Sequence, residues 1–259
     1  MTGALAERHA LVTGGARGLG GSIASALVAA GARVTLVGRD ATALDAHAAK
    51  LCVTGEAQGI AADVTDDAAV TAAFARAAAS FGPVEILINN AGLPLSAAFV
   101  ETDAASWNAV IDVTLNGTYR CTRAAVDGML AHGFGRIVNV ASTAGLSGGS
   151  YISAYCAAKH GVVGLTRALA VEYAGRGITI NAVCPGFIAG ERFDAAIAVV
   201  VRRSNRTAQE ASAAILTSAQ QARLLRPEEV AAAVVRLASP SAEATTGATL
   251  VIDGSETPT

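Results

Sequence analysis

The sequence contains no long run of one charge sign, which argues against nucleic acid as a partner. Lys and Arg total 19 against 21 Asp and Glu, so the formal net charge is −2. An apolar membrane span is also missing, because the longest uncharged stretch, residues 137–158, is broken by Asn139 and by several serines and glycines. Alanine accounts for much of the 52% hydrophobic share. We therefore expect neither a nucleic-acid partner nor a membrane segment.

Cysteines are few, and their spacing gives no group typical of a metal site. The four are Cys52, Cys121, Cys156 and Cys184, and they fit reduced thiols in a cytosolic protein. Residues 1–9 lack the charged start and the apolar core of a signal peptide. The sequence thus predicts a cytoplasmic protein without a bound metal.

Strand-like apolar runs alternate with helical segments along the chain, and no break divides it. Such alternation is typical of an α/β protein with a doubly wound parallel sheet that helices cover on both faces. A length of 259 residues suits a single domain of this kind over residues 1–259. We expect about seven strands, near residues 9–13, 33–38, 57–61, 84–89, 135–140, 179–184 and 249–252.

A glycine-rich turn follows the first expected strand. It reads Thr13-Gly-Gly-Ala-Arg-Gly-Leu-Gly20 and leads into an alanine-rich helix over residues 18–30. In this arrangement, backbone N–H groups at the start of the helix face a pyrophosphate, and glycine removes the Cβ that would block its approach. The turn therefore predicts a dinucleotide site.

Two arginines bear on which dinucleotide is bound. The second expected strand ends in Gly38-Arg39, near the point where an acidic residue would hold the ribose 2′-hydroxyl. The planar cation of Arg39 suits a 2′-phosphate, and Arg17 within the turn offers a second cation. Asp40 either caps the following helix, which we prefer, or reaches the ribose. These residues favour NADP(H), and NAD(H) remains the alternative.

The segment Tyr155-Cys-Ala-Ala-Lys159, with Ser142 thirteen residues before Tyr155, predicts proton transfer to a carbonyl oxygen. In a helix over residues 152–174, positions 155 and 159 share one face, with Cβ atoms roughly 5–6 Å apart. A nearby ammonium favours the phenolate and brings the pKa of a tyrosine, ordinarily about 10, toward working pH. The Ser142 hydroxyl can donate to the same oxygen and stabilise a developing alkoxide. The pattern therefore predicts nicotinamide-dependent interconversion of a ketone and an alcohol.

Together these motifs resemble those of the classical short-chain dehydrogenase/reductase family, and the likeness covers essentially the whole chain. Further matching segments are Asp63-Val64, Asn89-Asn90-Ala91-Gly92 and Pro185-Gly186. The resemblance implies a Rossmann-type fold and a catalytic tetrad in which an Asn helps to hold a water that relays protons to the Lys. The tetrad positions are Asn116, Ser142, Tyr155 and Lys159. The implied cofactor contacts are Gly14, Arg17, Gly18, Leu19, Gly20, Arg39, Asp63, Val64, Asn90, Ala91, Gly92, Tyr155, Lys159, Pro185, Gly186 and Ile188.

One position departs from the family pattern. Family members often read Pro-Gly-x-x-x-Thr after the sixth strand, and the Thr hydroxyl bonds the nicotinamide carboxamide. This chain reads Pro185-Gly-Phe-Ile-Ala-Gly190, so the side-chain contact is missing. We expect backbone groups near Ile188 to hold the carboxamide, with weaker or differently ordered cofactor binding and not loss of activity.

Residues 187–226 are expected to form a substrate lid, because they follow the sixth strand and would cover the cofactor. An apolar run at residues 195–201 is followed by Arg202, Arg203 and Arg206. One interpretation is an apolar wall for an acyl chain, with the arginines binding phosphates of coenzyme A or a phosphopantetheine arm. The other is a helix that packs on the core and leaves its arginines solvated.

Within the family, residues 153–166 and 182–187 resemble polyketide ketoreductases and 3-oxoacyl-thioester reductases. The resemblance implies NADPH-dependent reduction of a 3-oxoacyl thioester, bound to coenzyme A or a carrier protein, or of a related ketone. It also implies a homotetramer or homodimer. An NAD-dependent dehydrogenase of secondary alcohols, 3-hydroxyacyl or aryl, is the alternative. A non-catalytic nucleotide-sensing member would need a broken site, whereas all four tetrad positions are filled.

Overall fold

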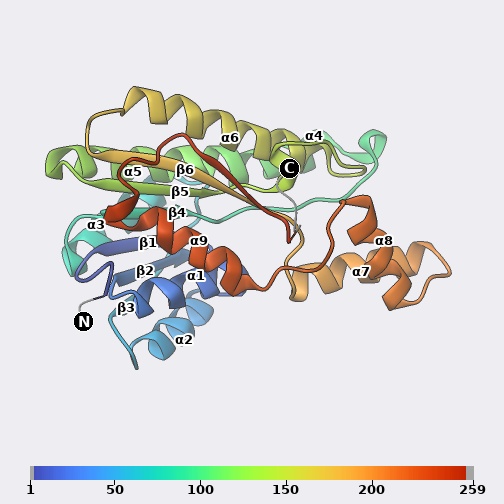
Figure 1. Cartoon of the computed structure of the whole chain (residues 1–259), viewed down its shortest axis with the longest axis horizontal. Coiled ribbons are helices and arrows are strands. Elements are labelled where there is room, and N and C mark those ends of the chain that lie inside the picture. Colours follow the sequence, from blue (N-terminus) through green and yellow to red (C-terminus); the bar gives the residue numbers. More distant parts are fainter. Residues whose placement is uncertain (1–2, 255–259) are drawn as a thin grey trace.

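A single sheet of seven parallel strands forms the centre of the molecule in this computed structural model (Figure 1). The structure describes residues 3–254, so the two ends of the predicted domain, residues 1–2 and 255–259, lie outside the described part. The strand order is β3-β2-β1-β4-β5-β6-β7, which confirms the predicted doubly wound α/β class. The strands are β1 (His9–Thr13), β2 (Arg33–Gly38), β3 (Ala57–Ala61), β4 (Ile86–Asn89), β5 (Gly135–Val140), β6 (Ile178–Pro185) and β7 (Thr249–Ile252).

Helices cover both faces of the sheet. Successive side chains of a strand point to opposite faces, so Ala10 and Val12 of β1 face one helical layer and Leu11 faces the other. The first layer contains α1 (Gly18–Ala29), α2 (Ala41–Leu51) and α9 (Pro227–Ala238); the second contains α3 (Asp67–Phe81), α5 (Gly117–His132) and α6 (Ser153–Glu172). Because both faces are buried, the central strands read as almost continuous apolar runs.

A chain of buried polar side chains crosses the middle of the sheet. The Asn89 amide, at the end of β4, donates to Thr122 of α5 at 3.1 Å and to Asn139 of β5 at 2.9 Å. Asn139 in turn donates to Thr166 of α6 at 2.8 Å. These bonds fix α5 and α6 against the two central strands, since a buried amide left without its partner costs about 1–3 kcal/mol.

Two helices, α7 (Glu191–Arg203) and α8 (Ala208–Ser218), extend beyond the two layers as a hairpin, at the right of Figure 1. At its base, the Gln221 side chain accepts from the Phe187 N–H at 2.7 Å and donates to the Phe187 carbonyl at 2.8 Å. The Phe193 ring packs against that of Phe187 with centroids 5.5 Å apart. The apolar run at residues 195–201 lies within α7 and packs mainly on α8. The hairpin is therefore attached at its base and has little contact with the sheet.

The described part of the chain offers no membrane-type helix and no cluster of metal ligands. Across residues 3–254, every helix is too short or too polar to cross a membrane. No three His, Cys, Asp or Glu side chains in that range lie close enough to share a metal ion. The four cysteines are free thiols. Burial raises the pKa of the Cys121 thiol to about 12, so this side chain is a neutral part of the core.

Candidate active site

Most of the predicted site residues gather at one edge of the sheet. The strand order reverses between β1 and β4, and ligands of parallel α/β sheets bind at such a switch point, beyond the carboxyl ends of the strands. The glycine-rich turn follows β1, residues 90–92 follow β4, Ser142 follows β5 and Gly186 follows β6. The topology thus brings together segments that are far apart in the sequence.

The turn after β1 has no room for side chains at two of its glycines. A Cβ on Gly20 would lie 2.1 Å from the Gly14 carbonyl oxygen, and Gly14 itself has a φ of +64°. At Gly18, by contrast, a Cβ would meet nothing within 4 Å, so this side of the turn is open. Arg17, the residue before α1, makes no side-chain cap. Uncapped N–H groups at a helix start bind phosphate groups, so the turn fits the dinucleotide that the sequence predicts.

Asn90 and Thr13 hold this turn in place. The Asn90 amide donates to the carbonyl oxygens of Thr13 and Gly14 at 3.0 and 3.2 Å. The Thr13 hydroxyl accepts from the N–H groups of Asn90 and Ala91, both at 3.0 Å. The Asn90 side chain therefore supports the turn. Direct contact of Asn90, Ala91 and Leu19 with a cofactor stays a prediction.

The two arginines that favour NADP(H) have different surroundings. Arg17 forms an ion pair with Asp40, with Nη2 2.5 Å from Oδ2. Asp40 also caps α2, because its carboxylate accepts from the Ala43 N–H at 3.0 Å, as the preferred interpretation expects. Arg39 is exposed and forms no ion pair with any residue that the structure describes. Arg39 is thus ready to meet a 2′-phosphate, whereas Arg17 would first have to leave Asp40.

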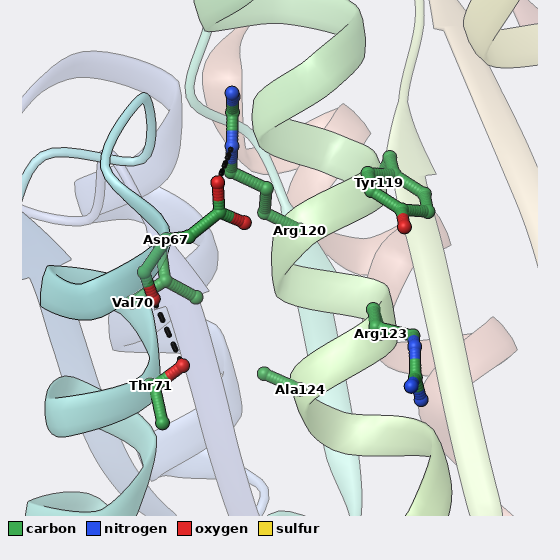
Figure 2. Close-up of a pocket in the computed structure, with 7 residues that line it drawn as sticks. All are labelled: Asp67, Val70, Thr71, Tyr119, Arg120, Arg123 and Ala124. Carbon is green, nitrogen blue, oxygen red and sulfur yellow. Dashed lines mark hydrogen bonds and ion pairs between the residues drawn. The ribbon is translucent and has the colours of Figure 1, made fainter.

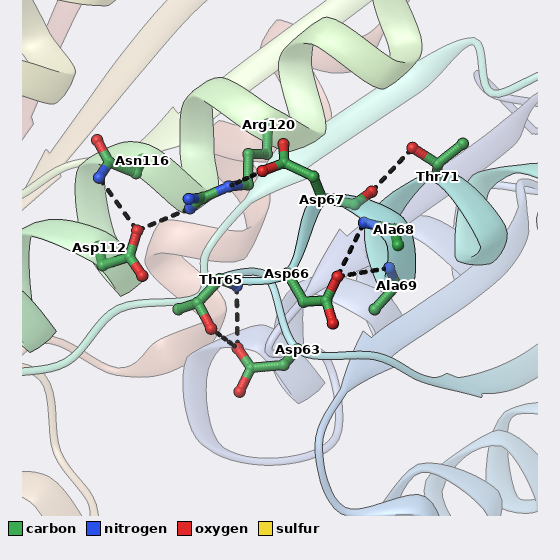
Figure 3. A network of polar contacts seen from close by, with 10 residues as sticks. All are labelled: Asp63, Thr65, Asp66, Asp67, Ala68, Ala69, Thr71, Asp112, Asn116 and Arg120. Atoms are coloured by element: carbon green, nitrogen blue, oxygen red, sulfur yellow. Dashed lines mark hydrogen bonds and ion pairs between the residues drawn. The ribbon is translucent and has the colours of Figure 1, made fainter.

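Asp63 and Val64 follow β3, where the family resemblance implies contact with adenine. One oxygen of the Asp63 carboxylate accepts from the N–H and the hydroxyl of Thr65 at 3.0 and 2.9 Å (Figure 3). Val64 packs against the start of α5, since a Cβ on Gly117 would lie 2.8 Å from its Cγ2. The adenine end of the predicted site is therefore built directly against α5. The adenine contact itself stays a prediction.

Tyr155 and Lys159 lie together on α6, as their spacing predicts. The Lys159 Nζ is 5.6 Å from the centroid of the Tyr155 ring and donates to the Val140 carbonyl at 2.6 Å. Only 4% of Lys159 is exposed. Burial, aided by the positive charge of Arg192 on α7, lowers the pKa of Lys159 to about 8. The lysine therefore changes its charge close to physiological pH.

The phenol of Tyr155 behaves differently from the sequence expectation. Burial raises the pKa of Tyr155, and the charge of Arg192 and a hydrogen bond with Ser142 oppose this only in part. We expected Lys159 to bring this pKa down, but burial outweighs the neighbouring charges. The Ser142 hydroxyl accepts from the Ala144 N–H at 3.2 Å. Tyr155 is thus kept protonated, which suits a proton donor to a carbonyl oxygen.

The structure does not bring Asn116 to these three residues. Asn116 ends a π turn, Asp112–Asn116, that joins α4 (Ala104–Ile111) to α5. Its amide donates to Asp112 at 3.1 Å, and Asp112 also accepts from Arg120 at 2.8 Å (Figure 3). Arg120 reaches on to Asp67 of α3 at 3.2 Å. Asn116 therefore belongs to a surface network between α3 and α5.

Thr114 is the residue of this turn that adjoins the lysine. It is the buried residue of the turn, and a Cβ on Gly92 would lie 3.7 Å from its Oγ1 and 3.6 Å from the Lys159 Nζ. Matching by residue type selects the nearby Asn116 and misses Thr114. A π turn inserts an extra residue and changes which side chains face inward. The structure thus replaces Asn116 by Thr114 beside Lys159.

Ile188 keeps its backbone groups available. It lies in a parallel bridge with Leu225, and the two bonds of that bridge use the Phe187 carbonyl at 3.0 Å and the Ala189 N–H at 2.8 Å. Within residues 3–254, the N–H and carbonyl of Ile188 itself have no backbone partner. This arrangement fits the expected backbone contact with the carboxamide.

Gly190 has a physical reason to replace the Thr of the family pattern. Its φ is +134°, a conformation that residues with side chains rarely adopt. Gly186, earlier in the same turn, is packed so tightly that a Cβ would lie 2.5 Å from the Gln221 Oε1. The chain thus leaves Pro185 through a backbone path that only glycine suits at residues 186 and 190.

A second hollow lies between α3 and α5. Arg120 bridges it to Asp67, while Tyr119 is 54% exposed at its edge (Figure 2). None of the predicted site residues lines it. The lining consists of Asp67, Val70, Thr71, Tyr119, Arg120, Arg123 and Ala124.

Dinucleotide-dependent oxidoreductases of the Rossmann class place a phosphate turn after the first strand and the reacting groups at the same sheet edge. The chain has this plan, and its residues 8–199 match the family model of short chain dehydrogenases, so it belongs to that family. Members bind NAD(P) and interconvert alcohols and ketones, and this chain is an oxidoreductase of that kind.

Individual relatives cover almost the entire chain. The chain is 38% identical to 2-(S)-hydroxypropyl-CoM dehydrogenase 3 of Xanthobacter autotrophicus (strain ATCC BAA-1158 / Py2), over 99% of both proteins. It is also 38% identical to acetoacetyl-CoA reductase of Shinella zoogloeoides, over 96% of this chain and 98% of the relative. A structure of an actinorhodin polyketide ketoreductase variant with NADPH has a TM-score of 0.92 and 36% identity, and the match covers 98% of each chain.

Proposed function

We propose that this chain is a cytoplasmic, NADPH-dependent reductase of a 3-oxoacyl thioester or a related ketone. The observation that carries the cofactor choice is Arg39, an exposed cation without an ion-pair partner among the described residues, at the position of the ribose. Support for the substrate comes from similarity to an acetoacetyl-CoA reductase and to a polyketide ketoreductase solved with NADPH. A homotetramer or homodimer and a lid over residues 187–226 are parts of the same proposal.

The α7–α8 hairpin supports a substrate with an acyl chain and a phosphate-bearing carrier. Residues 196–201 of α7 are only half-buried, so an apolar surface remains for a ligand. Arg202 and Arg203 at the end of α7 are exposed and form no ion pair within the described residues. Such guanidinium groups suit the phosphates of coenzyme A or a phosphopantetheine arm.

In the proposed reaction, the Ser142 hydroxyl donates to the substrate carbonyl oxygen and Tyr155 transfers its phenolic proton to that oxygen. The nicotinamide supplies the hydride when it is bound. The Lys159 ammonium then returns a proton to the Tyr155 oxygen and takes one from the solvent side. Ile188 orients the carboxamide through its backbone groups.

The direct test pairs NADPH and NADH with acetoacetyl-CoA and a few aryl ketones, and the oxidised cofactors with the matching alcohols. Turnover of the thioester with NADPH is expected, followed by nicotinamide absorbance. Turnover confined to NAD and simple secondary alcohols would favour the alternative, an NAD-dependent dehydrogenase. The Arg17–Asp40 ion pair is the observation that favours this alternative, because it reduces the positive charge offered to a 2′-phosphate.

Arg39→Ala is expected to raise the KM for NADPH roughly 10- to 100-fold and to leave the KM for NADH nearly unchanged, because one charge-assisted hydrogen bond is lost. Arg76→Ala is the matched control, since Arg76 is an exposed arginine on α3. Steady-state kinetics with each cofactor measures the effect. Equal changes for NADPH and NADH would contradict a role for Arg39 in reading the 2′-phosphate.

Asp40→Asn is expected to lower the KM for NADPH by roughly 2- to 5-fold, which is the scale of an exposed ion pair. Asparagine can still cap α2 through its side-chain oxygen, while Arg17 is released from the carboxylate. The same kinetic assay applies, with thermal unfolding to verify that the cap survives. If NADH binding weakens and NADPH binding does not improve, Asp40 reads the ribose hydroxyl and the cofactor proposal fails.

Ketone reduction is expected to slow as pH rises through about 8, where Lys159 loses its proton. Reduction consumes a proton and needs the ammonium, so its kcat/KM falls with pH, whereas oxidation of the matching alcohol rises over the same range. The midpoint belongs to the coupled Tyr155–Lys159 pair. Profiles of kcat/KM in both directions measure it, and flat profiles through this range would contradict the assignment.

A further inference from the structure

The π turn that joins α4 to α5 faces the catalytic pair with a threonine. Thr114 has 0% of its surface exposed, and it is the buried residue of the turn Asp112–Asn116. Its main-chain carbonyl accepts from the Thr118 hydroxyl at 2.8 Å. Its own hydroxyl accepts from the Leu93 N–H at 3.2 Å. The side chain is therefore fixed by bonds to two different segments.

The Thr114 hydroxyl and the Lys159 ammonium face the same small space beside Gly92. A Cβ built on Gly92 would lie 3.7 Å from the hydroxyl oxygen and 3.6 Å from Nζ, which are ordinary contact distances. The space between the two polar groups can thus hold one further atom without a clash. Among the described residues, the ammonium has one acceptor, the Val140 carbonyl, and the hydroxyl hydrogen has none. Two buried groups therefore keep unused donors at the same place.

Asn116 is bound elsewhere and does not compete for this role. Its amide points to Asp112, away from α6, in Figure 3. A hydrogen bond from Arg120 holds the pKa of Asp112 below its usual value, so the carboxylate stays ionised and retains both partners. The turn is anchored on its outer side by this network, and Thr114 is presented on its inner side.

We propose that Thr114 is a positioning residue that holds a water beside Lys159 and thereby completes proton resupply to Tyr155. The inference rests on the proposed catalytic pair. The Tyr155 proton goes to the substrate oxygen, the Lys159 proton goes to Tyr155, and the water gives a proton to Lys159 and regains one from solvent. A buried water needs two to four polar partners, and the ammonium and the threonine hydroxyl provide two. A hydroxyl thus does here what the family resemblance assigns to an amide.

Thr114→Val tests this role, because valine keeps the shape and removes only the hydroxyl. The expected result is a fall in kcat of roughly 10-fold or more, a nearly unchanged KM for the ketone, a larger solvent deuterium isotope effect and a shifted pH midpoint. Thr114→Ser keeps the hydroxyl and is expected to restore both kcat and the pH profile. A merely structural role would change thermal unfolding and would leave the isotope effect and the pH midpoint in place.

Asn116→Ala is the matched control, expected to keep the parent kcat and pH profile. Loss of activity in Asn116→Ala, or parent values of kcat, isotope effect and pH midpoint in Thr114→Val, would overturn the proposal. If the valine variant does not fold, Thr114→Ala replaces it and is judged by the same three readouts. All variants are assayed with whichever carbonyl compound the unmodified protein reduces. A wrong substrate class therefore appears in the unmodified protein, and a wrong role for Thr114 appears only in the variants.

Discussion

Tyr155→Phe is expected to lower kcat for carbonyl reduction by roughly 10³-fold while cofactor binding and thermal stability stay close to those of the unmodified protein. The substitution removes only the phenolic oxygen. The buried, protonated phenol beside Ser142 is the acid in the proposed reaction, and phenylalanine has no proton to transfer to the substrate oxygen. Single-turnover kinetics with saturating NADPH measures the chemical step, and fluorescence titration measures cofactor affinity.

Tyr151→Phe provides the matched control for this experiment. Tyr151 lies one helical turn before Tyr155 in the sequence, is 59% exposed and takes no part in the site described here. Its replacement is expected to leave kcat within about 2-fold, as for most surface substitutions. Near-normal turnover in Tyr155→Phe would show that another group delivers the proton, and the mechanism would then fail although the fold and the family would stand.

Lys159→Met is expected to lose activity by roughly 10²-fold or more and at the same time to become more stable at neutral pH. Burial lowers the pKa of Lys159 from 10.5 to about 8, which at about 1.4 kcal/mol per pKa unit means that keeping the charged lysine buried costs about 3 kcal/mol. Loss of the bond to Val140 offsets about 1 kcal/mol of this. Urea unfolding at pH 7 is thus expected to show a net gain of about 2 kcal/mol.

The pH dependence of this gain has a defined sign. Below pH 8, folded and unfolded chains both hold the proton, and the folded protein bears the full cost. Between about 8 and 10.5 the folded protein loses its proton first, so the stability of the unmodified protein rises with pH and the advantage of methionine shrinks. Lys50→Met, on the exposed end of α2, is the control and is expected to change little. A less stable Lys159→Met protein at pH 7 would contradict this account.

The sheet could be read from the sequence because its strands are buried on both faces and form distinct apolar runs. Five of the expected ranges coincide with observed strands, and the other two, 84–89 and 179–184, differ by at most two residues at an end. The pairing of Tyr155 with Lys159 was equally accessible, since four-residue spacing places two side chains on one face of any α-helix.

The contents of the site beyond that pair depend on contacts that the sequence does not display. The π turn brings Thr114 inward and turns Asn116 out, and residue type alone favours the wrong one. The pKa of Tyr155 depends on how deeply α6 is buried, which outweighs the nearby lysine. The ion pair between Arg17 and Asp40 joins residues from two different turns. The lid, the oligomer and the substrate stay predictions.

The base of the α7–α8 hairpin gives this protein a modular architecture. The chain leaves the body at Phe187 and returns near Gln221, and these two residues bond directly to each other. Everything between Gly190 and Gln220 can therefore be exchanged for the corresponding segment of a relative without cutting the sheet or moving α6. Substrate range and catalytic chemistry reside in separable parts of this chain, so grafting a foreign hairpin is a practical way to redirect the enzyme while its proton-transfer machinery stays in place.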